Sequence, residues 1–249
     1  MINNTDIVFV TTTLYTKWLT YQQKLIKKYF PESQHIIVDG RQNWPNSWFY
    51  WIENVKLNSA KYFVHIDEDF FITNKNELLR CIEKMEESDI DLLGCPDGYH
   101  KYRGANPVAI NTFLMIGKVD KLKNINLNNI KFAYTERGWI NNLGLLFKDD
   151  YKIDFNYKFE KNGDGKFYFE QEPYYAFMWY MKEIGCKFDY LYPYFDDRFK
   201  STNPRLDDKS EDIGIHMWYT RQWNQPMDVW GMPNSERYNL IEKYLIEND

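Results

Sequence analysis

Short apolar runs alternate with amphipathic stretches through the first part of the chain. Short apolar runs at 6–12, 35–39, 61–66 and 91–94, the first three rich in β-branched and aromatic residues, predict buried strands. Between them, apolar residues recur every three or four positions, which predicts helices. The residues that mark these helices are Trp18, Tyr21, Leu25 and Tyr29, then Trp48, Trp51, Ile52 and Val55, then Leu78, Leu79, Ile82 and Met85. This alternation predicts βαβ units and a mostly parallel sheet flanked by helices.

The second half of the chain has a different pattern of short apolar segments. The elements that it predicts are a polar loop at 97–107, a strand at 108–116, short strands within 151–169, an apolar helix at 170–184, a strand at 187–191, an irregular stretch at 193–233 and a final helix at about 235–247. Neither an internal repeat nor a low-complexity linker interrupts the 249 residues, so we predict one α/β domain with a mixed second half.

Charge and composition exclude several classes of function. The net charge is −5 and the chain has no dense Lys/Arg run, so we expect no binding along a nucleic-acid backbone. A small phosphate-bearing molecule remains compatible, because a bound metal supplies positive charge. Aromatic residues make up 18% of the chain; most are expected in the core, and flat aromatic faces also suit sugar rings.

The cysteines and the N-terminal segment indicate a compartment. Three cysteines, Cys81, Cys95 and Cys186, occur without a CxxC pair, which argues against a disulfide framework and a zinc site. The N-terminal segment lacks the basic and apolar regions of a signal peptide, and no apolar run reaches the roughly 18 residues of a spanning helix. We therefore expect a cytoplasmic protein without a transmembrane segment. Peripheral contact with a membrane that carries a lipid-linked acceptor stays open.

Residues 65–70, His-Ile-Asp-Glu-Asp-Phe, carry the strongest chemical signal. Asp67 and Asp69 stand where the third strand ends, and residues two apart in an extended chain point to the same side. Ligands of open α/β sheets bind outside the carboxyl ends of the strands. Carboxylates and substrate phosphates are the ligands that Mg²⁺ and Mn²⁺ prefer. The pair therefore predicts a metal site that holds a phosphate-bearing donor, with a solvated sheet edge as the alternative.

A second Asp-x-Asp, Asp89-Ile90-Asp91, shows that the pattern alone is weak. It begins a strand rather than ending one, so we interpret it as a solvated loop or cap. His65 is expected to point away from the aspartate pair and to be structural.

The order of strand, Asp-x-Asp and helix on an N-terminal sheet resembles the glycosyltransferases of the GT-A fold. The resemblance covers residues 6–116 and reaches His216 more loosely. It implies a Rossmann-like sheet in which Asp67 and Asp69 bind Mn²⁺ or Mg²⁺ and the diphosphate of a nucleotide-sugar. It also implies a nucleotide-sugar-binding half, 1–116, and an acceptor-side half with a C-terminal extension, 117–249.

His216 matches the histidine that often completes the metal site in this family. Its surroundings are similar to a His-x-x-Gly-x-x-Lys-Pro-Trp stretch of some retaining members, but without the glycine, with Arg221 in place of the lysine and with one residue fewer before Trp223. Arg221 then suits bidentate binding of the diphosphate. An ordinary buried histidine beside tryptophans is the alternative.

The resemblance also suggests donor-binding positions at other strand ends. Thr11 and Thr13 end the first strand and Asp39 ends the second, where relatives hold the base and ribose. Asp39 suits a uracil N–H or a ribose hydroxyl, and a turn-forming Asp-Gly is the equal alternative.

The donor sugar is expected near the polar loop and the strand that follows it. Asp97, Arg103 and Asn111 lie in the segments that resemble the sugar pocket, and a solvated loop is as compatible with these residues.

Glu170, Gln171 and Glu172 open the predicted apolar helix. The acid-Gln-acid pattern resembles the element that faces the acceptor and the anomeric carbon in GT-A enzymes. One carboxylate would deprotonate the acceptor in an inverting enzyme or stabilise the reacting carbon in a retaining one, towards which the pattern leans slightly. Simple capping of a helix N-terminus is the alternative.

The combined interpretation is a metal-dependent transferase of a hexose from a nucleoside diphosphate, expected to be UDP, to a glycan or lipid-linked acceptor. A sugar nucleotidyltransferase is disfavoured because no glycine-rich basic loop follows the first strand, where the sequence is VTTTLYTKW. A non-catalytic carbohydrate-binding relative is the remaining alternative.

Overall fold

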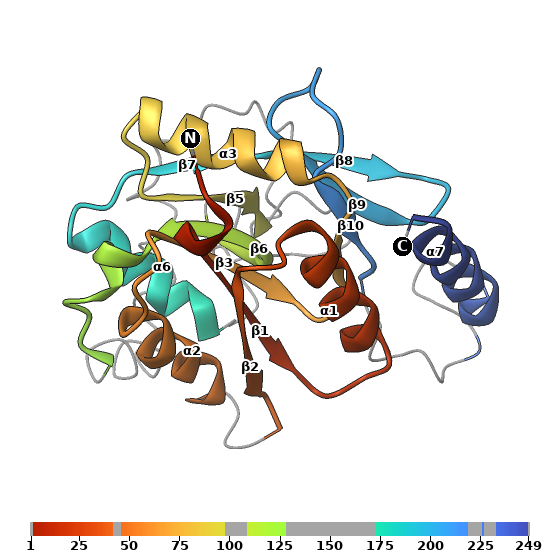
Figure 1. Cartoon of the computed structure of the whole chain (residues 1–249), viewed down its shortest axis with the longest axis horizontal. Coiled ribbons are helices and arrows are strands. Elements are labelled where there is room, and N and C mark those ends of the chain that lie inside the picture. The colour runs from red at the N-terminus through yellow and green to blue at the C-terminus, as the bar shows by residue number, and fades with distance from the viewer. Residues whose placement is uncertain are drawn as a thin grey trace, which may run out of the picture.

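The computed structural model describes residues 2–41, 46–97, 109–127, 173–218, 226 and 233–248. These residues form two sheets surrounded by five helices of more than one turn, with 3₁₀ turns at Asn4–Asp6 and Val119–Leu122 (Figure 1). Within the described part, the helices lack the combination of length and apolar character needed to cross a bilayer.

The main sheet has six strands in the order β2-β1-β3-β6-β5-β7. Their bounds are β1 (Ile7–Thr13), β2 (Gln34–Asp39), β3 (Tyr62–Asp67), β5 (Leu92–Pro96), β6 (Ile110–Lys118) and β7 (Phe188–Tyr190). Strand β6 runs antiparallel to both of its neighbours, and the pairs β1–β2, β1–β3 and β5–β7 are parallel. The predicted α/β fold with a mostly parallel sheet is therefore confirmed. Both halves of the chain contribute strands to this sheet.

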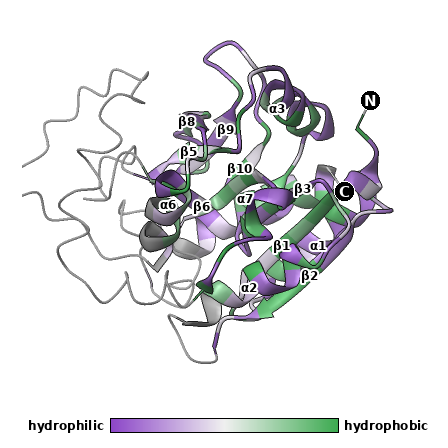
Figure 2. Cartoon of the chain, turned by 90° about the vertical axis from the view of Figure 1, so that its left-hand side faces the viewer, coloured by the Kyte–Doolittle hydropathy of each residue, from purple (hydrophilic) through white to green (hydrophobic). Residues whose placement is uncertain are grey.

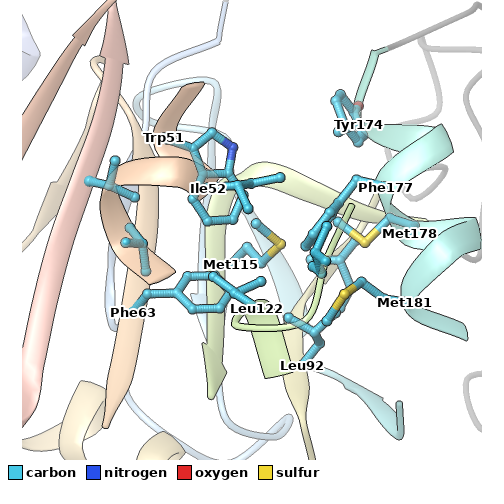
Figure 3. Close-up of a cluster of buried hydrophobic side chains, with 14 of the residues drawn as sticks. Trp51, Ile52, Phe63, Leu92, Met115, Leu122, Tyr174, Phe177, Met178 and Met181 are labelled. Atoms are coloured by element: carbon cyan, nitrogen blue, oxygen red, sulfur yellow. The ribbon is translucent and has the colours of Figure 1, made fainter. Parts of the chain in front are cut away.

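Helices cover both faces of the main sheet. Helices α1 (Trp18–Tyr29) and α3 (Lys75–Glu87) pack on one face, and α2 (Asn46–Lys56) and α6 (Pro173–Glu183) pack on the other. In Figure 3, Phe177 and two methionines of α6 face Trp51 of α2 and Phe63 of β3 across the sheet surface. The Trp51 ring lies 5.2 Å from Phe63 and 5.6 Å from Phe177. Hydrophobic colour is concentrated on the central strands in Figure 2.

A second, antiparallel sheet lies beside the first, in the order β4-β10-β9-β8. Its strands are β4 (Phe70–Ile72), β8 (Tyr192–Asp196), β9 (Ser201–Arg205) and β10 (Gly214–His216). The C-terminal helix α7 (Asn234–Asn248) packs against this sheet and α1, as Figure 1 shows, through Tyr238, Ile241 and Leu245.

The expectation of an irregular stretch from 193 to 233 was wrong for its described part. Strands β8, β9 and β10 lie there, and they are three to five residues long, too short to show a clear alternation. Two prolines pair directly across β8 and β9, Pro193 with Pro204, which hid the strands in the sequence because proline cannot donate to a ladder.

Candidate metal and donor site

Asp67, Asp69 and His216 converge at the carboxyl end of β3. One ligand atom from each residue lies within 4.8 Å of the others, and His216 Nε2 is 3.3 Å from Asp69 Oδ1. The first two residues follow the main sheet, whereas His216 ends β10 in the second sheet. The cluster therefore forms at the junction of the two sheets.

A turn, rather than strand alternation, directs the two aspartates. Strand β3 ends at Asp67, residues 68 and 69 form the turn, and β4 begins at Phe70. The expectation that both aspartates extend from one strand was therefore wrong for Asp69. Pairing of β4 with β10 places His216 opposite Phe70, next to the turn.

Gln22 of α1 holds this turn from behind. Its Nε2 donates to the carbonyl oxygens of Asp67, at 2.6 Å, and Phe70, at 2.9 Å. The backbone N–H of Met217 donates to the carbonyl of Asp69 at 3.0 Å. Since buried carbonyls without partners are costly, these bonds stabilise one conformation of the turn.

Glu68, between the two aspartates, turns inward. Only 5% of it is exposed, and its Oε2 accepts bonds from the Thr13 hydroxyl and from the backbone N–H groups of Leu14, at 3.1 Å, and Thr16, at 3.4 Å. Burial raises the pKa of the Glu68 carboxyl, and the bond from Thr13 partly offsets this increase. Glu68 thus ties the loop after β1 to the turn that carries the aspartates.

Aromatic rings fix the imidazole of His216, which is 3% exposed. It stacks on Phe113 with ring centroids 4.2 Å apart and an interplanar angle of 11°, and the ring centroid of Trp218 also lies 4.2 Å away, with its plane tilted by 55°. Gly214 allows the close approach of β10 to β4, because a Cβ there would lie 2.3 Å from the Phe71 carbonyl oxygen. His216 is therefore rigidly placed beside Asp69.

This donor set fits a hard divalent cation. Two carboxylates and one imidazole suit Mg²⁺ or Mn²⁺, which complete their shells with water and substrate phosphates. Two ligand atoms on opposite sides of one ion are about 4.2 Å apart when each bond is about 2.1 Å long. The ligand atoms here lie within 4.8 Å of one another, so the widest separation must shorten by about half an ångström when an ion binds.

His65 and the second Asp-x-Asp, Asp89 and Asp91, lie outside the metal cluster and contact protein groups. His65 is fully buried, its Nδ1 is 2.9 Å from the Thr112 carbonyl oxygen, and burial lowers its pKa to about 4. His65 and Asp67 are two residues apart in β3, so strand alternation points them to the same side and does not turn His65 away as expected. Packing against Trp51 encloses the imidazole instead.

The second Asp-x-Asp was expected to be solvated. Asp89 is exposed and paired with Lys187, as expected, but Asp91 is buried, so the expectation was wrong for Asp91.

Thr11 and Thr13, expected beside the nucleotide, are buried and bind protein groups. The Thr11 hydroxyl donates to Gln22 Oε1 at 2.8 Å, and the Thr13 hydroxyl binds Glu68. Both hydroxyls thus support the residues that hold the aspartate turn. Their contact with a nucleotide stays a prediction.

Asp39 lies at the end of β2, next to the end of β1, and binds Arg41. The guanidinium donates to both carboxylate oxygens, at 2.9 and 2.7 Å, and these bonds lower the pKa of Asp39 to about 2. Arg41 also lies over the ring of Tyr15, 4.5 Å from its centroid. Tyr15 is half exposed and has a φ of +60°, which is uncommon for a non-glycine residue.

Asp97 and Asn111 are in direct contact. The Asn111 side-chain N–H donates to Asp97 Oδ1, and Asn111 Oδ1 accepts from the backbone N–H of Phe113 at 3.0 Å. Asp97 and Asn111 are both buried. The remaining candidates, Arg103, Glu170, Gln171, Glu172 and Arg221, lie outside the described residues.

Two supporting residues were missed by sequence reasoning: Gln22 and Glu68. A polar residue on the apolar stripe of a helix was the available signal for Gln22, which follows Trp18 by four positions. Glu68 carried no signal, because its neighbours are also acidic.

Neither a protein family model nor a curated protein matches the sequence. In structure, the chain is similar to a glycosyltransferase involved in glycosylation of the major capsid of PBCV-1, with a TM-score of 0.41 and 14% identity over 74% of this chain and 81% of that one. It is also similar to the mannosyltransferase PcManGT from Pyrobaculum calidifontis, solved with GDP-Man and Mn²⁺, with a TM-score of 0.34 and 10% identity over 49% and 48%. A third similar structure is an active-site mutant of LgtC, with a TM-score of 0.34 and 12% identity over 51% and 62%. Likenesses this distant carry no functional conclusion.

Proposed function

We propose that this chain is a metal-dependent glycosyltransferase that uses a nucleoside-diphosphate sugar. The observation that carries the proposal is the convergence of Asp67, Asp69 and His216, from two different sheets, within 4.8 Å at the carboxyl end of β3. This end of an open α/β sheet is the usual place for a ligand.

The residues of the site suit a diphosphate donor. Three protein ligands leave coordination positions of a Mn²⁺ or Mg²⁺ ion for phosphate oxygens. When bound, the cation neutralises the charge that develops on the leaving diphosphate. In this proposal Asp67, Asp69 and His216 hold and orient the donor, and Arg221 binds the diphosphate from the side.

The nucleoside is proposed to lie over the ends of β1 and β2. Tyr15 presents a half-exposed ring there, and Arg41 and Asp39 provide donors and acceptors beside it. Thr11 and Thr13, at the end of β1, are proposed to lie beside the nucleoside. UDP is the proposed nucleotide.

The sugar and the acceptor are proposed to lie on the side of Asp97 and Asn111. Their mutual hydrogen bond orders two polar side chains at neighbouring strand ends. Arg103 is proposed to add a donor for the sugar hydroxyls. Glu170, Gln171 and Glu172 directly precede α6 in the sequence, and one of these carboxylates is proposed to act on the acceptor hydroxyl or the anomeric carbon.

Release of nucleoside diphosphate from a panel of nucleotide-sugars, led by UDP-hexoses, tests the proposal. We expect release with Mn²⁺ that is lost with a chelator. Release of pyrophosphate would instead indicate a nucleotidyltransferase, and binding of a glycan without turnover of any donor would indicate a carbohydrate-binding protein.

His216→Asn is expected to weaken Mn²⁺ affinity more than it lowers the melting temperature. Mutation of a residue that orients a metal ligand typically lowers affinity by about 10- to 100-fold, and we expect loss of a ligand to cost at least as much. Protons compete for the imidazole lone pair, so wild-type affinity should fall from about pH 8 to about pH 6, and more steeply than that of the variant. Titration of Mn²⁺ with each protein measures both effects.

The contrary result would be an unchanged Mn²⁺ affinity in a less stable variant. His216 would then act only through its contact with Asp69, whose Oδ1 lies 3.3 Å from His216 Nε2.

A further inference from the structure

Arg237, near the start of α7, is a fully buried cation behind the candidate metal site. Its relative exposure is 0%. Removing a guanidinium from water costs several kcal/mol unless hydrogen bonds compensate, so such a residue has a specific structural reason.

The guanidinium binds the chain directly after His216. Its Nη1 and Nη2 each donate to the carbonyl oxygen of Trp218 at 3.1 Å, and Nη2 also donates to the carbonyl of Met217. Its Nε donates to the carbonyl of Phe199 at 3.1 Å. The planar guanidinium presents these donors in a fixed geometry, so it specifies the path of residues 217 and 218.

The bound segment needs such a restraint. Trp218 has a φ of +26°, a conformation that non-glycine residues rarely adopt and that the surroundings must impose. Its indole N–H donates to the Thr202 hydroxyl at 2.7 Å, and its ring lies 4.2 Å from the ring of His216. Restraint of Trp218 therefore restrains the imidazole.

Met217 connects Arg237 to the aspartate turn. Its N–H donates to the Asp69 carbonyl at 3.0 Å, while its own carbonyl accepts from Arg237. One residue thus links the C-terminal helix to the turn that carries Asp69, whose other carbonyl bonds come from Gln22.

We propose that Arg237 is a positioning residue for the candidate metal site, holding Met217 and Trp218 so that His216 faces Asp69. This inference rests on the proposed function, because it requires that the three residues bind a metal. Arg237 acts through the backbone and does not touch the ion or the substrate. Helix α7 is therefore part of the site's construction as well as a cover for the second sheet.

Arg237→Lys tests the inference, because it keeps the charge and removes the planar fork. We expect Mn²⁺ affinity, measured from the free-ion EPR signal, to fall about tenfold, the lower end of the effect of residues that orient metal ligands. Thr202→Val removes the other tether of Trp218 and should weaken Mn²⁺ binding in the same direction, so it carries the test if Arg237→Lys does not fold.

Tyr21→Phe is the matched control. It removes the 2.5 Å bond from the Tyr21 hydroxyl to Glu242, which joins α1 to α7 away from residues 217 and 218. The control should lower the melting temperature and leave Mn²⁺ affinity unchanged.

Unchanged Mn²⁺ affinity in both Arg237→Lys and Thr202→Val would overturn the inference while leaving the proposed function intact. An equal loss of affinity in Tyr21→Phe would also overturn it, since general docking of α7 would explain the effect. A third outcome would overturn the proposed function and this inference together. In it, the wild-type chain binds no Mn²⁺, and Asp69→Asn gives the same signal as the wild type.

Discussion

Asp67→Asn and Asp69→Asn are each expected to lower Mn²⁺-dependent release of nucleoside diphosphate by about 10³-fold or more. A metal supplies several kcal/mol of stabilisation to developing negative charge, and each 1.36 kcal/mol corresponds to a tenfold change in rate, so loss of about 4 kcal/mol gives this factor. An amide oxygen is neutral and binds a hard cation more weakly than a carboxylate does.

The folds of both variants should remain intact. The bonds from Gln22 to Asp67 and from Met217 to Asp69 go to backbone carbonyls, which the substitutions keep. Circular dichroism and thermal melting in a chelator would verify this, and steady-state release of nucleoside diphosphate would measure the loss of activity.

Asp89→Asn is the matched control within the same chain. Asp89 belongs to the second Asp-x-Asp, but its side chain is 71% exposed and pairs with Lys187 at the opposite end of the sheet. Exposed ion pairs contribute little, so the control should keep both activity and stability. Full wild-type activity in excess EDTA would contradict the metal role of Asp67 and Asp69 directly.

One of Glu170→Gln and Glu172→Gln is expected to lose about 10²-fold or more in turnover, the scale of a positioned acid–base group. The sequence pattern predicts a helix from residue 170, and residues two apart in a helix point in directions about 200° apart. On that prediction, one carboxylate faces the site and the other does not. The second variant should change turnover by less than about threefold on the same reasoning. Donor affinity should survive in both, because neither residue contacts the diphosphate in the proposal.

Helix α6 provides the reference for this comparison. Its buried stripe consists of Tyr174, Phe177, Met178 and Met181. In the helix predicted from residue 170, this stripe continues backwards to Glu170 rather than Glu172, which favours Glu170 as the group that faces the site. Glu183→Gln, at the exposed C-terminal end of the same helix, is a control that should leave turnover unchanged. Near-wild-type turnover in both test variants would leave the segment as a helix cap. Steady-state kinetics with separately measured donor binding decides between these outcomes.

The pattern of apolar residues was sufficient to predict the main sheet and its helices. Strands β1, β3 and β5 are hydrophobic runs buried on both faces, β2 is a partly buried edge strand, and the helices between them show a regular apolar stripe, so local sequence specifies these elements. The same pattern placed Asp67 at the end of a strand. The sequence also predicted that Asp67, Asp69 and His216 would converge, but it placed both aspartates on one strand, whereas Asp69 lies in the turn after β3.

Only the tertiary structure decided how the site is assembled. The second sheet consists of strands too short for a periodic signal, and its pairing of β4 with β10 brings together residues that are 147 positions apart, Asp69 and His216. Gln22, Glu68 and Arg237 are polar residues that become buried because distant carbonyl, hydroxyl and amide groups meet them. Such partners lie far away in the sequence, and contacts of this kind depend on the packed fold rather than on local propensity.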